Sequence, residues 1–185
     1  MKNKLLKIKR YFSKIRRVSK LSKKEKYVWN DLIHLLDELQ LNYSRNDAEK
    51  TIYLSMSFNE ETTVVSFRIS LYGRSLTAGA LIIDDIDAEK TNDMLVLASH
   101  MNSMLPVGNV LVNASKGYIE YFLEMDICRL LLYPDEIYEG IHIHYIFTKD
   151  HILPTFQKMQ NSWEDPIFVF SEFMEKYNNK QAEKE

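Results

Sequence analysis

The segment from Asp84 to Met125 constrains the fold more than any other part of the sequence. It reads as an amphipathic helix that stops at Pro106 and Gly108, followed by two short strands, VLV and YIEYFLEM, joined by the turn NASKG. Proline disfavours helical geometry in the residue before it, and glycine supplies a flexible turn. The helix is therefore expected to lead directly into a β-hairpin.

Upstream of this segment the sequence predicts a helix and a three-stranded meander. Residues 27–41 have an apolar helical face and precede a turn-rich connection, NYSRNDAEK. Three strands are then predicted in TIYLSMSF, TVVSFRISLY and SLTAGALII. The third is apolar on both sides and is expected to be central, and Gly73-Arg74 is the tight connection that precedes it.

Downstream of Met125 the sequence predicts helices. Pro134, followed by Asp135 and Glu136, is typical of a helix start, while residues 141–147 alone fit either a helix or a strand. The prediction is an α+β fold of order α-βββ-α-ββ-α-α, in which a three-strand meander and a hairpin form an antiparallel sheet packed with helices. The last helix has an apolar stripe of helical spacing: Ile167, Phe170, Phe173, Met174 and Tyr177.

Charge is distributed unevenly along the 185 residues. The formal net charge is −2, but residues 1–26 hold 12 of the 24 Lys and Arg residues and one of the 26 acidic residues. The remainder therefore carries 12 basic and 25 acidic residues, a formal charge of −13. An acidic body argues against nucleic-acid binding by the folded domain, and no nucleic-acid partner is expected.

The basic segment, residues 1–26, is predicted to form an amphipathic helix that precedes the domain. Such a helix binds an anionic membrane surface or an acidic partner. A solvated terminus, docking of the apolar stripe on the domain and an organelle-targeting segment are the alternatives. The apolar stripe is Leu5, Ile8, Phe12 and Ile15, and the predicted contact residues are Lys7, Arg10, Lys14 and Arg17.

Two patterns invite a metal-site interpretation, and neither is sufficient. The run Asp84 to Asp87 lacks the spacing and the internal glycine of a calcium loop, and capping of the following helix explains it better. His142 and His144 would share a face on a strand, whereas on the predicted helix they diverge by about 200°. We therefore expect no metal, no cofactor and no enzymatic activity, with a metal-dependent enzyme as a distant alternative.

The cellular location is predicted from three observations. The first 26 residues lack the apolar centre of a secretory signal, and no stretch approaches the roughly 18 apolar residues of a membrane-spanning helix. The single cysteine, Cys128, excludes an intramolecular disulfide and is expected to be a small core residue. The expectation is a cytoplasmic protein, peripheral at the membrane if the basic segment binds there.

The element order and the junction between the central helix and the second hairpin resemble the YbjN-like family. That family shares the type III secretion chaperone-like fold, related to the Tir-chaperone type. The resemblance covers residues 27–160, leaving residues 1–26 and the aromatic helix with its polar end, residues 161–185, outside it. The junction has the form N-x-x-L-P-x-G, here Asn102, Leu105, Pro106 and Gly108.

This resemblance implies a non-enzymatic, chaperone-like domain that holds a protein client and forms a homodimer. It also implies a regulatory role, since the YbjN-like branch is labelled a regulator of sensory transduction. The negative charge of the body would favour basic clients. The rival prediction is a peripheral membrane or signalling adaptor that acts through residues 1–26.

Overall fold

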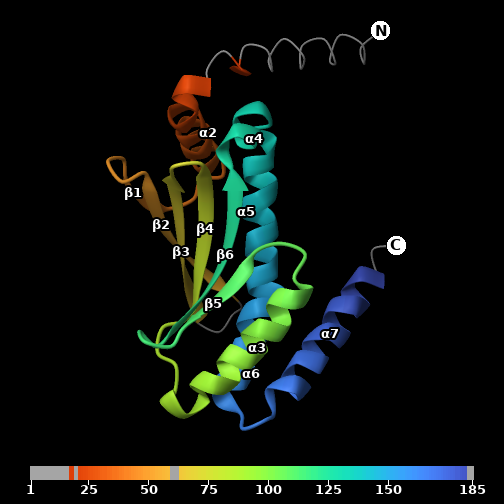
Figure 1. Cartoon of the computed structure of the whole chain (residues 1–185). Helices are drawn as coiled ribbons and strands as arrows, with labels where there is room; N and C mark the ends of the chain where they lie inside the picture. Colours follow the sequence, from red (N-terminus) through yellow and green to blue (C-terminus); the bar gives the residue numbers. More distant parts are fainter. Residues whose placement is uncertain (1–16, 19–20, 59–62, 183–185) are drawn as a thin grey trace.

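A computed structural model describes residues 17–18, 21–58 and 63–182 of the chain. Six antiparallel strands form one sheet in the order β1-β2-β3-β4-β6-β5, so β4 is central and β6 crosses over to lie beside it (Figure 1). The predicted α+β class and the central place of the third predicted strand, β4, are confirmed. The strands are β1 (Tyr43–Asn46), β2 (Thr51–Phe58), β3 (Thr63–Tyr72), β4 (Ser75–Ile83), β5 (Asn109–Asn113) and β6 (Tyr118–Asp126).

The helices precede, interrupt and follow the strands in the predicted order. In the part of the chain that the structure describes, none of them is long and apolar enough to cross a membrane. Short 3₁₀ turns, η1 (Leu21–Lys23) and η2 (Ala88–Lys90), open two of the helices. The helices are α2 (Lys24–Glu38), α3 (Thr91–Met104), α4 (Ile127–Leu132), α5 (Asp135–Phe147), α6 (Leu153–Asn161) and α7 (Pro166–Ala182), with the π-helical turn η3 (Thr148–Ile152) between α5 and α6.

The edge strand β1 is the element that the sequence does not predict. It pairs with β2, with Tyr43 opposite Leu54 and Asn46 opposite Thr51. Three of its four residues are exposed, and only Tyr43 is half-buried. Because no alternation of buried apolar side chains marks the strand, hydrophobic periodicity does not reveal it.

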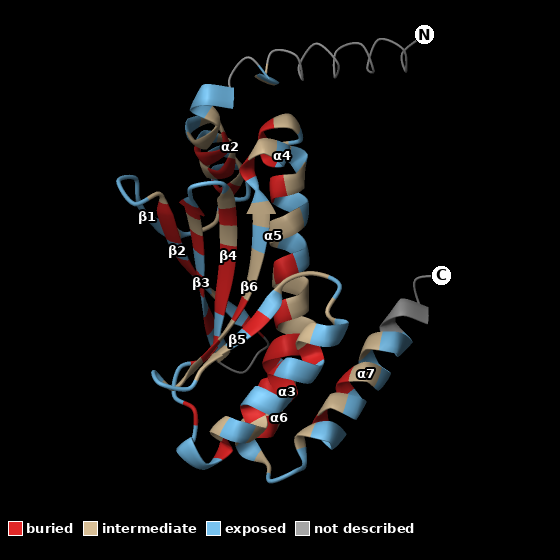
Figure 2. Ribbon diagram, viewed as in Figure 1, coloured by how far each residue is buried: buried red, intermediate tan, exposed pale blue. Residues whose placement is uncertain are grey.

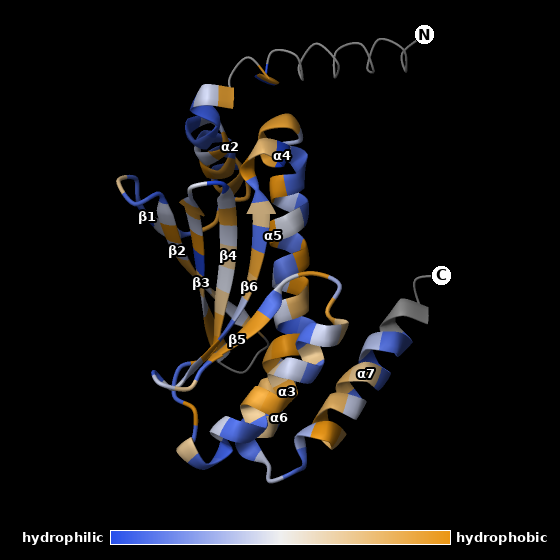
Figure 3. Ribbon diagram, in the orientation of Figure 1, coloured by the Kyte–Doolittle hydropathy of each residue, from blue (hydrophilic) through white to orange (hydrophobic). Residues whose placement is uncertain are grey.

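One face of the sheet carries the core. Successive residues of β2 and β3 alternate between buried and exposed, as expected for strands with one face covered (Figure 2). The same alternation appears as orange and blue or white stripes along these strands in Figure 3. The buried side chains of these strands belong to the same core cluster as those of α2, which are Val28, Trp29, Leu32 and Leu36, and Phe58 and Phe67 contact the Tyr145 ring of α5.

Residues 135–161 form a nearly continuous helical segment, α5-η3-α6. Residues 141–147 lie in α5, which settles the choice between helix and strand. The π turn η3 precedes Pro154, whose ring lacks the N–H that would donate back into the helix. A widened turn accommodates this break without ending the helix.

Helix α7 packs against α3 and α6 and adds Val169 and Phe173 to the core. Ile167, which the spacing places on the apolar stripe, is 56% exposed, so that part of the prediction is wrong. Residues two apart on a helix point in nearly opposite directions, and Val169 takes the inward position. The buried stripe of α7 is therefore shifted by two residues at its start.

Lys90 joins the start of α3 to the end of α6. Its side chain is almost fully buried, and Nζ donates to the carbonyls of Gln160 at 2.5 Å and Ser162 at 2.7 Å. Nζ also lies 4.6 Å from the centre of the Trp163 ring. The last carbonyls of a helix lack partners within it and form the negative end of its dipole. A single ammonium group therefore caps α6 and holds the loop that leads to α7.

We expect Lys90→Met to lower the free energy of unfolding by about 2 kcal/mol, because buried carbonyls lose a charged donor. Urea denaturation followed by circular dichroism measures this change. Lys116→Met is the matched control, since Lys116 is exposed in the turn between β5 and β6. Equal stability of the two variants would show that Lys90 does not support α6.

Candidate protein-binding surface

The face of the sheet opposite the core presents apolar and aromatic side chains to solvent. Tyr72 is 88% exposed and Val64 is 59% exposed. Exposed serines, including Ser55 and Ser66, lie between these side chains. Because serine side chains are short, this surface is flat. We call this surface the open face, and its apolar members are Tyr53, Val64, Tyr72, Leu81 and Leu111.

Strand register arranges the open face in rows that cross the sheet. In one row Tyr53 lies opposite Arg68, and Arg68 lies opposite Gly79. In the next row Glu120 of β6 lies between Leu81 of β4 and Leu111 of β5. Each of these two rows therefore contains both a charged side chain and a large apolar one.

An ion pair crosses the middle of the open face. Nη2 of Arg68 on β3 donates to Oε1 of Glu120 on β6 at 3.0 Å, although β4 lies between the two strands. Gly79 on β4 makes this approach possible, because a Cβ atom at that position would collide with the Glu120 carboxylate. The Glu120 side chain is 15% exposed and that of Arg68 is 53% exposed. The pair leaves the guanidinium accessible and shields the carboxylate.

The predicted junction covers the outer edge of β5. The Asn102 side chain accepts from the Val110 N–H at 2.7 Å and donates to the Val110 carbonyl at 2.9 Å. Leu105 ends α3 in an extended conformation, and Gly108 follows Pro106 with φ of +72°. A Cβ at Gly108 would lie 2.7 Å from both the Phe122 carbonyl and the Tyr121 ring. Asn102 therefore acts as a partner for an otherwise unpaired strand edge.

Among the predicted contact residues of the basic segment, Lys7, Arg10 and Lys14 lie outside the described residues. Arg17 is described, and it is bound to the domain rather than free. Its Nη1 donates to Asp31 Oδ2 on α2 at 2.7 Å and to the Leu131 carbonyl on α4 at 3.2 Å. The side chain is 24% exposed. The sequence carries no signal for these contacts, because α2 and α4, the two helices that Arg17 joins, meet only in the tertiary structure.

The structure separates the two histidines of α5. The buried His144 ring stacks on Tyr121 at 4.8 Å, and its Nε2 lies 3.0 Å from the Tyr121 carbonyl oxygen. His142 instead stacks on Tyr138. Burial lowers the pKa of His144 to about 4, so the ring is neutral and Nε2–H donates at neutral pH. Within the described residues no group of three or more His, Cys, Asp or Glu side chains could hold a metal ion.

The other candidate residues have structural roles. Asp87 accepts from the Glu89 N–H at 3.0 Å and caps η2, as the capping interpretation predicts, while Asp84 and Asp85 are exposed. Cys128 is half-buried rather than fully buried. Its sulfur lies 3.5 Å from Nζ of Lys24, a contact between α2 and α4.

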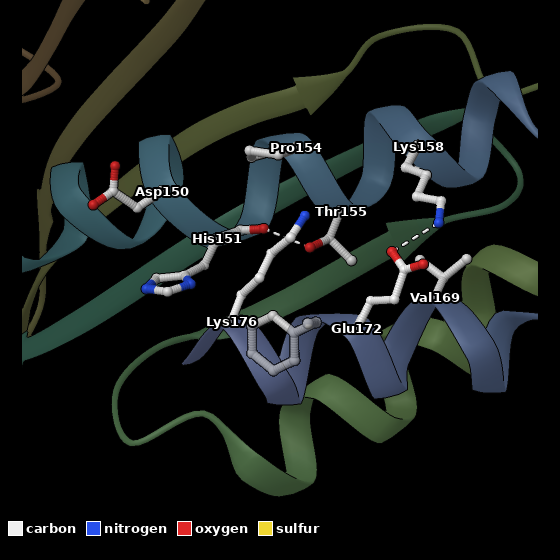
Figure 4. Close-up of a pocket in the computed structure, with 9 residues that line it drawn as sticks. Asp150, His151, Pro154, Thr155, Lys158, Val169, Glu172 and Lys176 are labelled. Carbon is white, nitrogen blue, oxygen red and sulfur yellow. Dashed lines mark hydrogen bonds and ion pairs between the residues drawn. The ribbon is translucent and has the colours of Figure 1, made fainter. Parts of the chain in front are cut away.

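A small cavity of about 90 Å³ lies between α6 and α7 (Figure 4). Nζ of Lys158 bridges Glu172 at 2.7 Å and Glu164 at 2.8 Å beside it. Hydrogen bonds to these two carboxylates raise the pKa of Lys158. The cavity has the volume of a few water molecules and an ion pair at its rim, so we interpret it as a packing gap between the helices.

No family model matches the chain, and no curated protein matches it. Among solved structures, the chain is similar to a chain in the crystal structure of the ExsC–ExsE complex. The TM-score is 0.43 and the identity is 14%, over 66% of this chain and 92% of that chain. Similarity of this extent establishes neither a family nor an activity, and membership of the YbjN-like family stays a prediction.

We expect stability to depend on pH through His144. The unfolded state takes up a proton near pH 6.5 and the folded state only near pH 4, so the free energy of unfolding falls as pH decreases between these values. The loss is at most about 3 kcal/mol. In urea titrations from pH 7.5 to 4, the advantage of the native chain over His144→Gln should therefore shrink. A pH-independent difference would contradict this, and His34→Gln, at an exposed position, is the control.

We expect Gly79→Ala and Glu120→Ala to be strongly non-additive. Alone, Gly79→Ala displaces the Glu120 carboxylate and breaks its ion pair with Arg68. In the Glu120→Ala background the same change meets no carboxylate and stabilises the strand by about 0.5–1 kcal/mol. A double-mutant cycle in urea should give a coupling energy of about 1 kcal/mol. Additive effects would show that the ion pair does not depend on Gly79.

Proposed function

We propose that this chain is a non-enzymatic, chaperone-like domain that binds a segment of another protein on the open face of its sheet. The observation that carries the proposal is the one-sided burial of the sheet. Helices bury one face, while Tyr53, Tyr72 and Leu111 remain accessible on the other. Exposed apolar side chains gathered on one surface are typical of protein-interaction sites.

The shape and composition of the open face fit a polypeptide better than a small molecule. A small-molecule site is concave and encloses its ligand, whereas the open face is a sheet surface lined by serines and tyrosines. Tyrosine offers a large apolar ring and a hydroxyl group in one side chain, and it is enriched where proteins contact one another. An extended segment lying on such a surface would place alternate side chains against it.

Charge favours a client segment that combines apolar and basic residues. Residues 27–185 carry a formal charge of −13, which attracts basic partners over several ångströms of solution. On the open face itself, Leu81 and Leu111 flank the carboxylate of Glu120. Arg68 already pairs with this carboxylate, so the attraction for basic clients comes from the net charge of the domain, and Leu81 and Leu111 offer apolar contact.

Formation of a homodimer, cytoplasmic location and a regulatory role are further parts of the proposal, and their support is the resemblance to the YbjN-like family. Sedimentation equilibrium of the purified chain reports its association state. The open face could be a self-association surface, so the test of client binding must distinguish a second copy from another protein.

Photo-crosslinking at the open face tests the proposal. A benzophenone amino acid at Tyr53 or at Tyr72 should form an adduct with a second protein in the cells that produce this chain. The same amino acid at Tyr133 or Leu95, which are exposed elsewhere, is the control for random collision. Leu81→Ser with Leu111→Ser should lower adduct formation at least about tenfold, because two apolar contacts are lost, and Leu95→Ser should leave it unchanged.

Two results would refute client binding at this surface. One is adduct formation of equal yield at Tyr133 and Leu95. The other is an adduct composed only of two copies of this chain, which would identify the open face as a dimer interface.

A further inference from the structure

Charged side chains are scarce on the strands that the structure describes, and they are distributed unevenly. Arg45 and Arg68 are the only basic residues of these strands. Arg45 lies opposite the buried Ile52, so it belongs to the other face of the sheet. Arg68 is therefore the only cation that the described strands place on the open face. The acidic residues all belong to β6 and are Glu120, Glu124 and Asp126.

The Arg68 guanidinium is held in place and still has donors to offer. Within the described residues its one hydrogen bond runs from Nη2 to Glu120 Oε1 at 3.0 Å. A guanidinium carries five N–H donors in a rigid fork, and about half of this side chain is exposed. Glu120 fixes one arm of the fork, and the missing side chain at Gly79 leaves room for the two groups to meet. The other N–H donors remain available to a ligand.

Hydroxyl groups lie beside this cation on the side away from β6. Tyr53 of β2 is directly opposite Arg68, and Ser55 and Ser66 form the neighbouring cross-strand pair. The side chains of Tyr53, Ser55 and Ser66 are exposed. Neighbouring cross-strand pairs lie about 7 Å apart, which a long arginine side chain can span. Along their described length, β2 and β3 therefore offer a positive charge and hydroxyl donors, with no carboxylate.

We propose that Arg68 recognises an acidic side chain, Asp or Glu, of the client segment at the centre of the open face. The inference rests on the proposed binding of a client at that face, and it specifies the chemistry of the client. Arginine binds planar carboxylates through two parallel N–H···O bonds, which fix orientation as well as charge. Glu120 uses one of the N–H donors and holds the guanidinium in a fixed position, so a second carboxylate can bind the rest of the fork.

The surroundings of Arg68 favour a carboxylate on a polypeptide over a phosphate group or a free anion. Phosphate groups carry nearly two negative charges and are bound by clusters of arginine. Here a single arginine faces the carboxylates of Glu120 and Glu124, which repel a dianion more strongly than a monoanion. A flat face does not enclose a small anion. The exposed side chains of Val64 and Leu81 would instead contact apolar residues that flank the acidic one.

The same charges determine how the segment lies across the sheet. Its acidic residue lies over β3, and its basic residues lie over β6, where Glu124 is exposed and accepts a hydrogen bond from the Ser75 hydroxyl. The formal charge of −13 on residues 27–185 attracts basic segments in general. One acidic residue among the basic ones then selects the segment that fits Arg68. Complementarity of this kind contributes to specificity and register more than to affinity.

Selection from a random peptide library on the immobilised full-length chain tests the inference. Open-face peptides are those that bind the native chain and are lost in Leu81→Ser with Leu111→Ser. Among them Asp or Glu should recur at one fixed position. Changing that residue to Asn or Gln should weaken binding at least about tenfold, and Arg68→Gln should weaken binding of the acidic peptide by a similar factor. The amide peptide should bind the native chain and Arg68→Gln equally. Fluorescence anisotropy of labelled peptides measures each affinity.

Arg45→Gln is the matched control and should leave binding unchanged. Arg45 is also a strand arginine in an ion pair, 3.3 Å from Asp47, and its exposure is similar to that of Arg68, but it lies on the other face. Arg68→Gln leaves the carboxylate of Glu120 without its partner, so a second variant, Arg68→Gln with Glu120→Gln, removes both charges. This variant should keep the native circular dichroism spectrum and should also lose the preference for the acidic peptide.

The outcomes separate this inference from the proposed function. Open-face peptides without a recurring acidic residue would overturn the inference and leave client binding standing. Acidic peptides that bind Arg68→Gln as tightly as the native chain would do the same. A library that yields no open-face peptide would contradict client binding itself, and the inference with it.

Discussion

The buried ring of Tyr121 is the point at which the sheet, the central junction and the long helical segment meet. Its hydroxyl donates to the Val107 carbonyl at 2.9 Å, and its ring lies against the space that Gly108 leaves open. On the other side it stacks on His144 of α5. Desolvation raises the pKa of Tyr121, so the phenol stays protonated and donates. This one side chain therefore positions three parts of the fold relative to one another: the hairpin β5-β6, the C-terminal end of α3, and helix α5.

One-sided burial then divides the surface of the molecule into two different regions. On the helical side, carboxylates of α2 and of the first turns of α5 line one depression, and apolar side chains of Leu39, Ile141 and Tyr145 line another. The open face contains tyrosines, leucines and serines around the Arg68–Glu120 ion pair. The two regions differ in chemistry because helix side chains line the first and alternate strand residues form the second.

Much of the fold could be predicted because its elements are amphipathic over a sufficient length. Strands β2 and β3 alternate, and β4 has apolar residues on both faces, so periodicity identifies them and the central position of β4. Helix α3 and its stop at Pro106 follow from local rules. Strand β1 was not predictable, because a short exposed edge strand has no buried face. Long-range contacts could not be predicted at all. Gly79 of the open face approaches Glu120, 41 residues away, and Lys90 caps α6 about 70 residues away.

The sequence by itself determined the fold class, the order of the longer helices and strands, the helical junction at Pro106 and Gly108, and the separation of a basic segment from an acidic body. These are properties of local geometry, periodicity and composition, which neighbouring residues decide. Only the tertiary structure decided that Arg17 pairs with Asp31, that Glu120 reaches Arg68 across Gly79, and that His144 is buried against Tyr121. Such contacts depend on register and on helix placement, which arise when the whole core packs together.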